Sequence, residues 1–157
     1  MYFSLELEDT QMFERMAQGV GEMAMEDVER VFKTKPEQSV ELTKKMMGEM
    51  PHAAVVDKGG LTIGQIEEYI RQGGLLKLGQ PARFIVVDYF GYMKFQGKTL
   101  YEATSYGAKQ LKELAKNLDL SIVVLAQVSR DYPPGEPLDL QAVRDTGVAE
   151  ESGTSAR

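Results

Sequence analysis

The stretch F-I-V-V-D at residues 84–88 decides the fold class of this chain. Its four apolar residues predict a strand that is buried on both faces, and the acidic residue closes it. Three further runs share this character: M-Y-F-S-L-E-L at residues 1–7, A-A-V-V-D at residues 53–57 and S-I-V-V-L-A at residues 121–126. Continuously apolar strands are typical of parallel sheets with helices on both faces, so we expect a sheet of this kind.

Apolar residues recur at helical spacing in the segments between these strands. Thr62 and Gln65 have the spacing of a capping box, which marks the start of one helix. Strands that alternate with helices indicate an α/β fold with right-handed crossovers. We expect helices from Asp9 or Thr10 to Gly21, around residues 25–33, from Ser39 to Pro51, from Thr62 to Gly73, and over Leu100–Leu118.

Length and composition predict one globular domain. The chain has 157 residues, of which 43% are hydrophobic and 27% are charged, so it can bury a single core. We expect the domain to span residues 1–149 and a disordered tail to occupy residues 150–157, which are small, polar and without periodicity. No signal segment or long apolar run is present, so we expect a cytoplasmic protein with no membrane partner.

Cysteine and histidine usage excludes several kinds of site. Cysteine is absent and His52 is the single histidine, which excludes cysteine nucleophiles and disfavours zinc sites and mechanisms that need two histidines. The net charge of -6 counts against a simple nucleic-acid binder, because such domains usually carry a basic surface. Any contact with DNA must therefore be local.

Polar residues close each of the four expected strands: Glu6, Asp57, Asp88 and Gln127. The carboxyl ends of parallel strands meet at one edge, where ligands of α/β sheets bind. Carboxylate oxygens suit magnesium and its phosphate substrates, so this edge is a candidate site for a magnesium-bound phosphate. The alternative is structural, since strand ends are often polar and aspartate commonly caps the next helix. The residues alone leave both interpretations open.

Five segments, taken in order, resemble motifs of one family, the RecA-like ATPase domain of DnaB-type replicative DNA helicases. Each match is weak by itself, but their order and spacing span nearly all of the chain. The segments are Y-F-S-L-E-L at residues 2–7, V-V-D-K-G-G-L-T-I at 55–63, I-V-V-D-Y-F at 85–90, L-K-E-L-A-K at 111–116 with V-L-A-Q-V-S-R at 124–130, and V-R-D-T-G-V-A-E at 143–150.

This resemblance implies a fold, two cofactors and a set of catalytic residues. The fold would be a RecA-like parallel sheet flanked by helices, and the cofactors would be ATP and magnesium. Glu6 would be the general base that polarises the attacking water, and Asp88 would hold magnesium through water. Gln127 would sense the terminal phosphate and relay its loss to the neighbouring loop.

The resemblance also implies partners. The loop from Val128 to Gly147 would line the channel of a ring-shaped homo-oligomer and hold single-stranded DNA. Arg130, Arg144, Asp145 and Gly147 are the positions that match the DNA-binding residues of the family. A helicase loader or a primase is a further expected partner.

One departure from the family pattern is important. The sequence contains no G-x-x-x-x-G-K-[ST] motif, whose amides and lysine grip the nucleotide phosphates. The segment that bears the arginine finger of the family is also not found. We therefore expect a RecA-like domain that is incomplete at both ends and inactive by itself.

Three functions are compatible with these observations. The first is part of an ATP-dependent replicative helicase motor that couples hydrolysis to movement along single-stranded DNA. The second is a non-catalytic DnaB-like paralogue that binds single-stranded DNA or a helicase subunit. The third is a recombination ATPase of the RecA or RadA type, which the segment at residues 143–150 disfavours.

Overall fold

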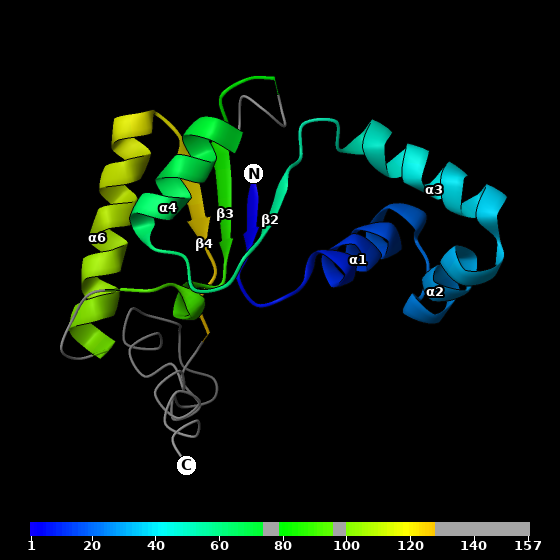
Figure 1. The fold of residues 1–157 in the computed structure, drawn as a ribbon, viewed down its shortest axis with the longest axis horizontal. Helices are drawn as coiled ribbons and strands as arrows, with labels where there is room; N and C mark the ends of the chain where they lie inside the picture. Colours follow the sequence, from blue (N-terminus) through cyan, green and yellow to red (C-terminus); the bar gives the residue numbers. More distant parts are fainter. Residues whose placement is uncertain (74–78, 96–99, 128–157) are drawn as a thin grey trace, which may run out of the picture.

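The computed structural model describes residues 1–73, 79–95 and 100–127. Its centre is one sheet of four parallel strands in the order β2-β1-β3-β4 (Figure 1). The parallel α/β architecture expected from the apolar strands is therefore confirmed. The strands are β1 (Tyr2–Ser4), β2 (Val55–Asp57), β3 (Phe84–Asp88) and β4 (Ser121–Val124).

The register of the strands brings their carboxyl ends to one edge. Ser4 of β1 lies opposite both Asp57 of β2 and Asp88 of β3. Val87 of β3 lies opposite Val124 of β4, so β4 ends beside the same edge. The residues that follow β1, β3 and β4 therefore emerge close together.

Helices α4 (Ile63–Glu68) and α6 (Leu100–Leu118) pack on one face of the sheet (Figure 1). The last turn of the α4 segment, Tyr69–Gly73, is a π-helix. This face holds the main hydrophobic core of the described residues. Burial of apolar side chains is the chief stabilising contribution to a fold, so these contacts hold the helices on the sheet. Its fully or nearly fully buried residues include Phe3, Leu61, Ile66, Ile85, Val87, Leu111 and Leu114.

Helix α6 approaches the loop after β3 through Gly107. A Cβ atom at this position would lie 2.2 Å from Cε1 of Phe95, which is far inside any normal contact. Phe95 in turn packs on Phe90, with ring centroids 4.7 Å apart. The absence of a side chain at Gly107 therefore lets the aromatic pair sit between α6 and the end of β3.

The predicted capping box at the start of α4 is present. The backbone N–H of Gln65 donates to Oγ1 of Thr62 at 3.3 Å, and the backbone N–H of Thr62 donates to Oε1 of Gln65 at 3.0 Å. Both bonds satisfy N–H groups that have no partner inside a helix.

Removal of the Thr62 hydroxyl should destabilise the domain. We expect Thr62→Ala to lower the free energy of unfolding by about 1 kcal/mol, because the N–H of Gln65 loses its acceptor. Chemical denaturation measures the change. The matched control is Thr43→Ala inside a helix, where the hydroxyl only donates to the carbonyl of Ser39 at 2.8 Å and alanine is the better helix former. An equal loss in both variants would contradict a capping role for Thr62.

The three remaining long helices form an arm beside the sheet (Figure 1). They are α1 (Asp9–Gly21), α2 (Met25–Thr34) and α3 (Pro36–Glu49). The arm has a small core of its own, in which Ala17, Val28, Leu42 and Met46 are buried. It is therefore a second packing unit, joined to the sheet through β1 and β2.

Two helix ends in the arm have features that the sequence analysis did not predict. Helix α3 begins at Pro36 instead of the predicted Ser39, because proline at the first helical position costs no hydrogen bond. The hydroxyl of Ser39 lies inside the helix and donates to the carbonyl of Pro36 at 2.7 Å. The residue that follows α1 is Glu22, whose φ of 52° is left-handed although it is not a glycine.

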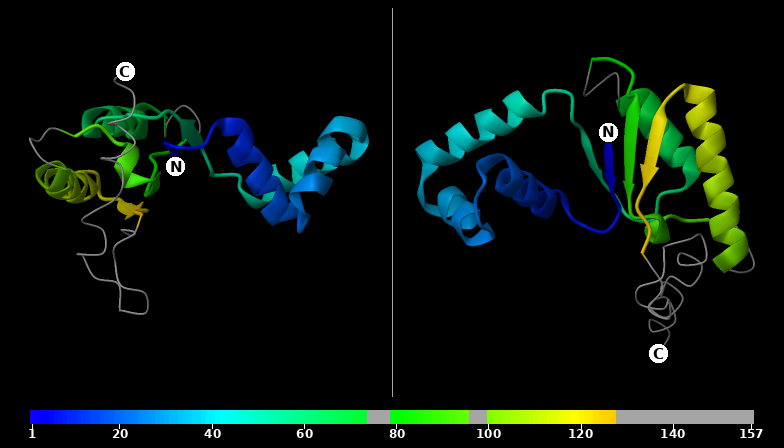
Figure 2. Two further views of the ribbon diagram at one scale, coloured as in Figure 1. Left: turned by 90° about the horizontal axis from the view of Figure 1, so that it is seen from below. Right: turned by 180° about the vertical axis from the view of Figure 1, so that it is seen from behind.

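The second face of the sheet differs from the expectation that helices cover both faces. In the described part of the chain, α4 and α6 lie behind the strands when the sheet is seen from the other side (Figure 2, right). Phe84 is 54% exposed and Val123 is 42% exposed on this open face. Apolar strands normally predict cover on both faces; here α4 and α6 cover one face, and the other is open at Phe84 and Val123, although Met12 and Met16 of α1 lie beside it.

Among the residues that the structure describes, none of the helices combines the length and the apolarity needed to cross a bilayer. The predicted tail at residues 150–157 and the last part of the predicted domain lie outside the described residues.

Candidate functional site

Three of the four predicted strand-end residues surround one cavity at the carboxyl edge of the sheet. Glu6, Asp88 and Gln127 line a space of about 320 Å³. Asp88 is partly buried, whereas Glu6 and Gln127 are exposed. The remaining lining residues are Tyr89, Tyr92, Leu125 and Ala126.

Backbone hydrogen bonds to the end of β3 hold this cavity together. On one side, the N–H of Leu5 donates to the carbonyl of Asp88 at 2.7 Å and thereby fixes the segment that carries Glu6. On the other side, the N–H of Leu125 donates to the carbonyl of Val87 at 3.0 Å, and the N–H of Phe90 donates to the carbonyl of Leu125 at 2.8 Å. Strand β3 therefore positions both flanking segments.

Asp57, the fourth strand-end residue, does not line the cavity. Its Oδ2 accepts the backbone N–H of Asp9 at 2.9 Å, at the first residue of α1. This role is structural, as the alternative interpretation had it, but the helix is α1 instead of the next helix along the chain. A carboxylate at a helix N-terminus satisfies a free N–H and interacts favourably with the helix dipole. The carboxyl edge therefore brings together two carboxylates and one amide instead of three carboxylates.

Asp88 has a hydrogen-bond partner that the sequence did not reveal. The phenol of Tyr2 donates to Oδ2 of Asp88 from the neighbouring strand. Burial, followed by this hydrogen bond and the negative charge of Asp88, raises the pKa of Tyr2 from 10.0 to about 12. Tyr2 therefore stays protonated, and remains a donor, at every physiological pH.

The donor set fits a magnesium ion that is held mainly by a nucleotide. Within the described residues, no group of three or more histidine, cysteine or acidic side chains converges to hold a metal by itself. Magnesium keeps several waters and is usually bound by one or two carboxylates together with substrate phosphates. Asp88 supplies such a carboxylate, with Glu6 across the same cavity.

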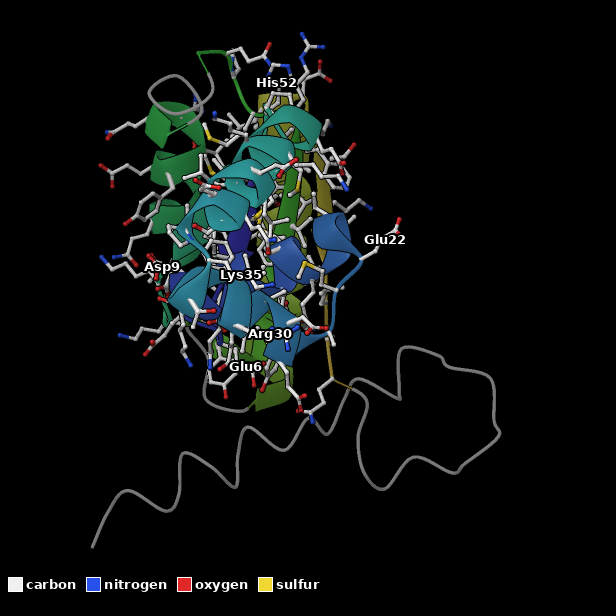
Figure 3. The ribbon with its side chains drawn as sticks, turned by 90° about the vertical axis from the view of Figure 1, so that its right-hand side faces the viewer. Glu6, Asp9, Glu22, Arg30, Lys35 and His52 are labelled. Atoms are coloured by element: carbon white, nitrogen blue, oxygen red, sulfur yellow. The ribbon has the colours of Figure 1, made fainter. Side chains whose placement is uncertain are left out.

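His52 lies far from this cavity. Figure 3 shows it at the opposite end of the molecule from Glu6. There it lines a second, largely apolar cavity of about 620 Å³ beside the amino ends of the strands, together with Met12, Met16 and Phe84. The single histidine is thus not available to the carboxyl edge.

A match to a protein-family model shows to which family the chain belongs. The model of the DnaB-like helicase C terminal domain matches residues 1–147. The chain belongs to this family. The resemblance found in the five sequence segments is thereby confirmed.

Solved structures support the same fold for this DnaB-like domain. One that is described as an "ATPase Domain" matches with a TM-score of 0.73 and 20% sequence identity, over 96% of this chain and 55% of that one. A second, described as "The Structure Of A DnaB-Like Replicative Helicase And Its Interactions With Primase", matches with a TM-score of 0.72 and 20% identity, over 96% of this chain and 37% of that one. The RecA-like fold class is confirmed. No curated protein sequence matches the chain.

The predicted DNA-binding positions of the DnaB-like domain are not placed by the structure. Arg130, Arg144, Asp145 and Gly147 lie outside the described residues. Their roles stay predictions from the sequence resemblance.

Proposed function

We propose that this chain belongs to an ATP-dependent replicative DNA helicase of the DnaB type, and that the carboxyl edge of its sheet carries the residues that hydrolyse ATP. The observation that carries the proposal is the meeting of Glu6, Asp88 and Gln127 around one cavity at the carboxyl ends of parallel strands. Ligands of open α/β sheets bind at this edge, and the family match covers all three residues.

The family resemblance suggests a role for each of these residues, and the position of each residue is compatible with that role. Glu6 is an exposed carboxylate and can accept a proton from the water that attacks the terminal phosphate. Asp88 would hold magnesium, and the ion when bound would neutralise charge on the transferred phosphoryl group. Gln127 lies just beyond β4, where its amide can donate to a phosphate oxygen and move the following loop when that phosphate leaves.

Nucleotide binding also needs groups that residues 1–157 do not supply. The missing G-x-x-x-x-G-K-[ST] motif would provide most of the charge-assisted contacts to the phosphates and the hydroxyl ligand of magnesium. We therefore expect residues 1–157 alone to hydrolyse no ATP. A chain that carries such a loop before Met1 is the form in which we expect turnover.

The proposed partners are single-stranded DNA, further copies of the chain in a ring, and a loader or primase, in the cytoplasm. A net charge of -6 leaves little general attraction for DNA, so the contacts must be few and local. In a ring, a few contacts from each subunit add up along the strand. We assign them to Arg130, Arg144, Asp145 and Gly147.

Arg144→Ala should weaken the binding of single-stranded DNA by the whole gene product. Log affinity falls as log salt concentration rises, and loss of one phosphate contact per subunit should make this slope less steep by roughly 0.7 for each contact removed. Fluorescence anisotropy over a salt series measures this slope. Arg83→Ala is the control, because Arg83 precedes β3 at the amino end of the sheet. An unchanged slope in Arg144→Ala would place the DNA site elsewhere.

A forked-duplex unwinding assay with the whole gene product tests the proposed function. We expect strand displacement that requires ATP and magnesium. Binding of single-stranded DNA without any ATP-dependent displacement or hydrolysis would contradict it.

A second candidate function is that of a non-catalytic DnaB-like paralogue, with which residues 1–157 are also compatible because they contain no G-x-x-x-x-G-K-[ST] motif. Such a protein would bind single-stranded DNA or a helicase subunit and would bind no nucleotide. A recombination ATPase would share the same edge of the sheet, and a strand-exchange assay separates it from a helicase.

A further inference from the structure

The partner of Asp88 comes from an unexpected position on β1. In the parallel register, Ser4 is the residue opposite Asp88, whereas Tyr2 is opposite Val86. Side chains two residues apart on a strand point to the same face, so Tyr2 and Ser4 share the face on which Asp88 lies. Tyr2 is long enough to reach along the strand, and its hydroxyl donates to Oδ2 of Asp88.

Ser4, the polar residue directly opposite Asp88, already has another hydrogen-bond partner. Ser4 is 1% exposed, and its hydroxyl donates to the carbonyl of Leu7 at 2.6 Å. This bond closes the bend that carries Glu6 between them. Ser4 therefore shapes the Glu6 segment, and its donor is directed away from Asp88. Tyr2 is the side chain that the structure shows donating to the Asp88 carboxylate.

A single donor to one oxygen restricts the carboxylate. A hydrogen bond to an ionised acceptor is stronger than one between neutral groups, so it fixes the orientation of the carboxylate. With Oδ2 occupied by the phenol, Oδ1 keeps its full capacity to accept from a water bound to a cation. Hydrogen bonds of this kind around metal ligands orient them and tune metal affinity.

We infer that Tyr2 is a positioning residue that holds the Asp88 carboxylate in the orientation needed to bind a divalent cation through water. The inference rests on the proposed function, because that function assigns the cation to Asp88. It also goes beyond that function, since neither the proposed function nor the family resemblance assigns a role to Tyr2. The hydroxyl group is the essential feature, and phenylalanine would keep the packing while losing the bond.

The test compares Tyr2→Phe with Tyr69→Phe by NMR on the chain of residues 1–157. Tyr69 is a suitable control because it packs edge-on against Phe3, with ring centroids 6.2 Å apart, on the other face of β1. The first readout is the three-bond coupling between N and Cγ of Asp88, which reports its χ1 rotamer. The second is titration with Mn²⁺ alone, read from paramagnetic broadening of the amides of Glu6, Asp88 and Tyr89.

In Tyr2→Phe we expect the coupling of Asp88 to move toward a rotamer average and the affinity for Mn²⁺ to fall about tenfold. Tyr69→Phe should leave both readouts at the wild-type values. Matching thermal unfolding of the two variants would show that neither change reflects a loss of folding.

Each failure has a separate meaning. If either readout in Tyr2→Phe equals that of the wild type, the positioning role is overturned and the proposed function stands. If Mn²⁺ causes no broadening near Asp88 in the wild type, Asp88 holds no cation in the absence of nucleotide and this inference is overturned, whereas the proposed function, in which a nucleotide holds most of the ion, is tested by ATP hydrolysis in the whole gene product. Asp88→Asn is the reference for complete loss of binding, because it should abolish the broadening if Mn²⁺ binds at Asp88.

Discussion

Glu6→Gln abolishes ATP turnover by the whole gene product and leaves ATP binding intact. This is the result we expect, because glutamine keeps the size and polarity of the side chain and loses the group that accepts a proton from water. General base catalysis contributes about 10²- to 10⁴-fold to a rate, so the loss should have this size. Steady-state hydrolysis and equilibrium binding of a fluorescent ATP analogue measure the two effects separately.

Glu8→Gln is the matched control for Glu6→Gln. Glu8 is also exposed and lies two residues further along, directly before α1, but it does not line the cavity of Asp88 and Gln127. It should keep wild-type turnover. Normal turnover in Glu6→Gln would remove Glu6 from the role of general base, whatever the control shows.

Phe3→Ala has the largest expected effect on stability. Phe3 is 0% exposed on β1, between β2 and β3, and its ring packs against Tyr69. Truncation of a buried phenylalanine removes its transfer free energy and leaves a cavity, which together cost about 3–5 kcal/mol. That is a large part of the stability of an ordinary domain, so the variant should be mostly unfolded at moderate denaturant concentrations.

Phe84→Ala provides the comparison for Phe3→Ala. Phe84 belongs to the adjacent strand but is 54% exposed on the open face. Its truncation should cost far less, because about half of its surface already contacts water. Chemical denaturation of both variants measures the difference, and equal losses would contradict the placement of the main core on the α4 and α6 face.

The most regular segments of the fold could be predicted to the residue. The strand at residues 84–88 and the helix over Leu100–Leu118 have the bounds that the sequence indicated. Both carry a strong local pattern, a continuous apolar run in one case and a long amphipathic repeat in the other. The capping box of Thr62 and Gln65 was equally readable, because two side chains define it.

Features that depend on tertiary contacts were not predicted correctly. The role of Asp57 at the start of α1 depends on a contact across 48 residues of sequence, which no local pattern contains. The open face bordered by Phe84 and Val123 has the composition of a covered face, so composition alone could not reveal it. Helix α1 ends at the predicted Gly21, although the left-handed residue after it is Glu22 and not a glycine.

The candidate site could be predicted in part. Topology alone brings Glu6, Asp88 and Gln127 to one edge, since parallel strands end together. Tyr2 was missed because its partner lies 86 residues away and is not the residue opposite it in the strand register. The sequence nevertheless contained an indication of this contact, because Tyr2 lies two residues before Ser4 and therefore on the same face of the strand. Ser4 is the residue opposite Asp88.

ATP hydrolysis with and without single-stranded DNA, measured on the whole gene product beside residues 1–157 alone, tests the assignment of the carboxyl edge most directly. We predict hydrolysis that DNA stimulates in the whole product and none in residues 1–157, which lack the phosphate-binding motif. Absence of nucleotide binding and hydrolysis in both forms would contradict the assignment and favour the non-catalytic paralogue.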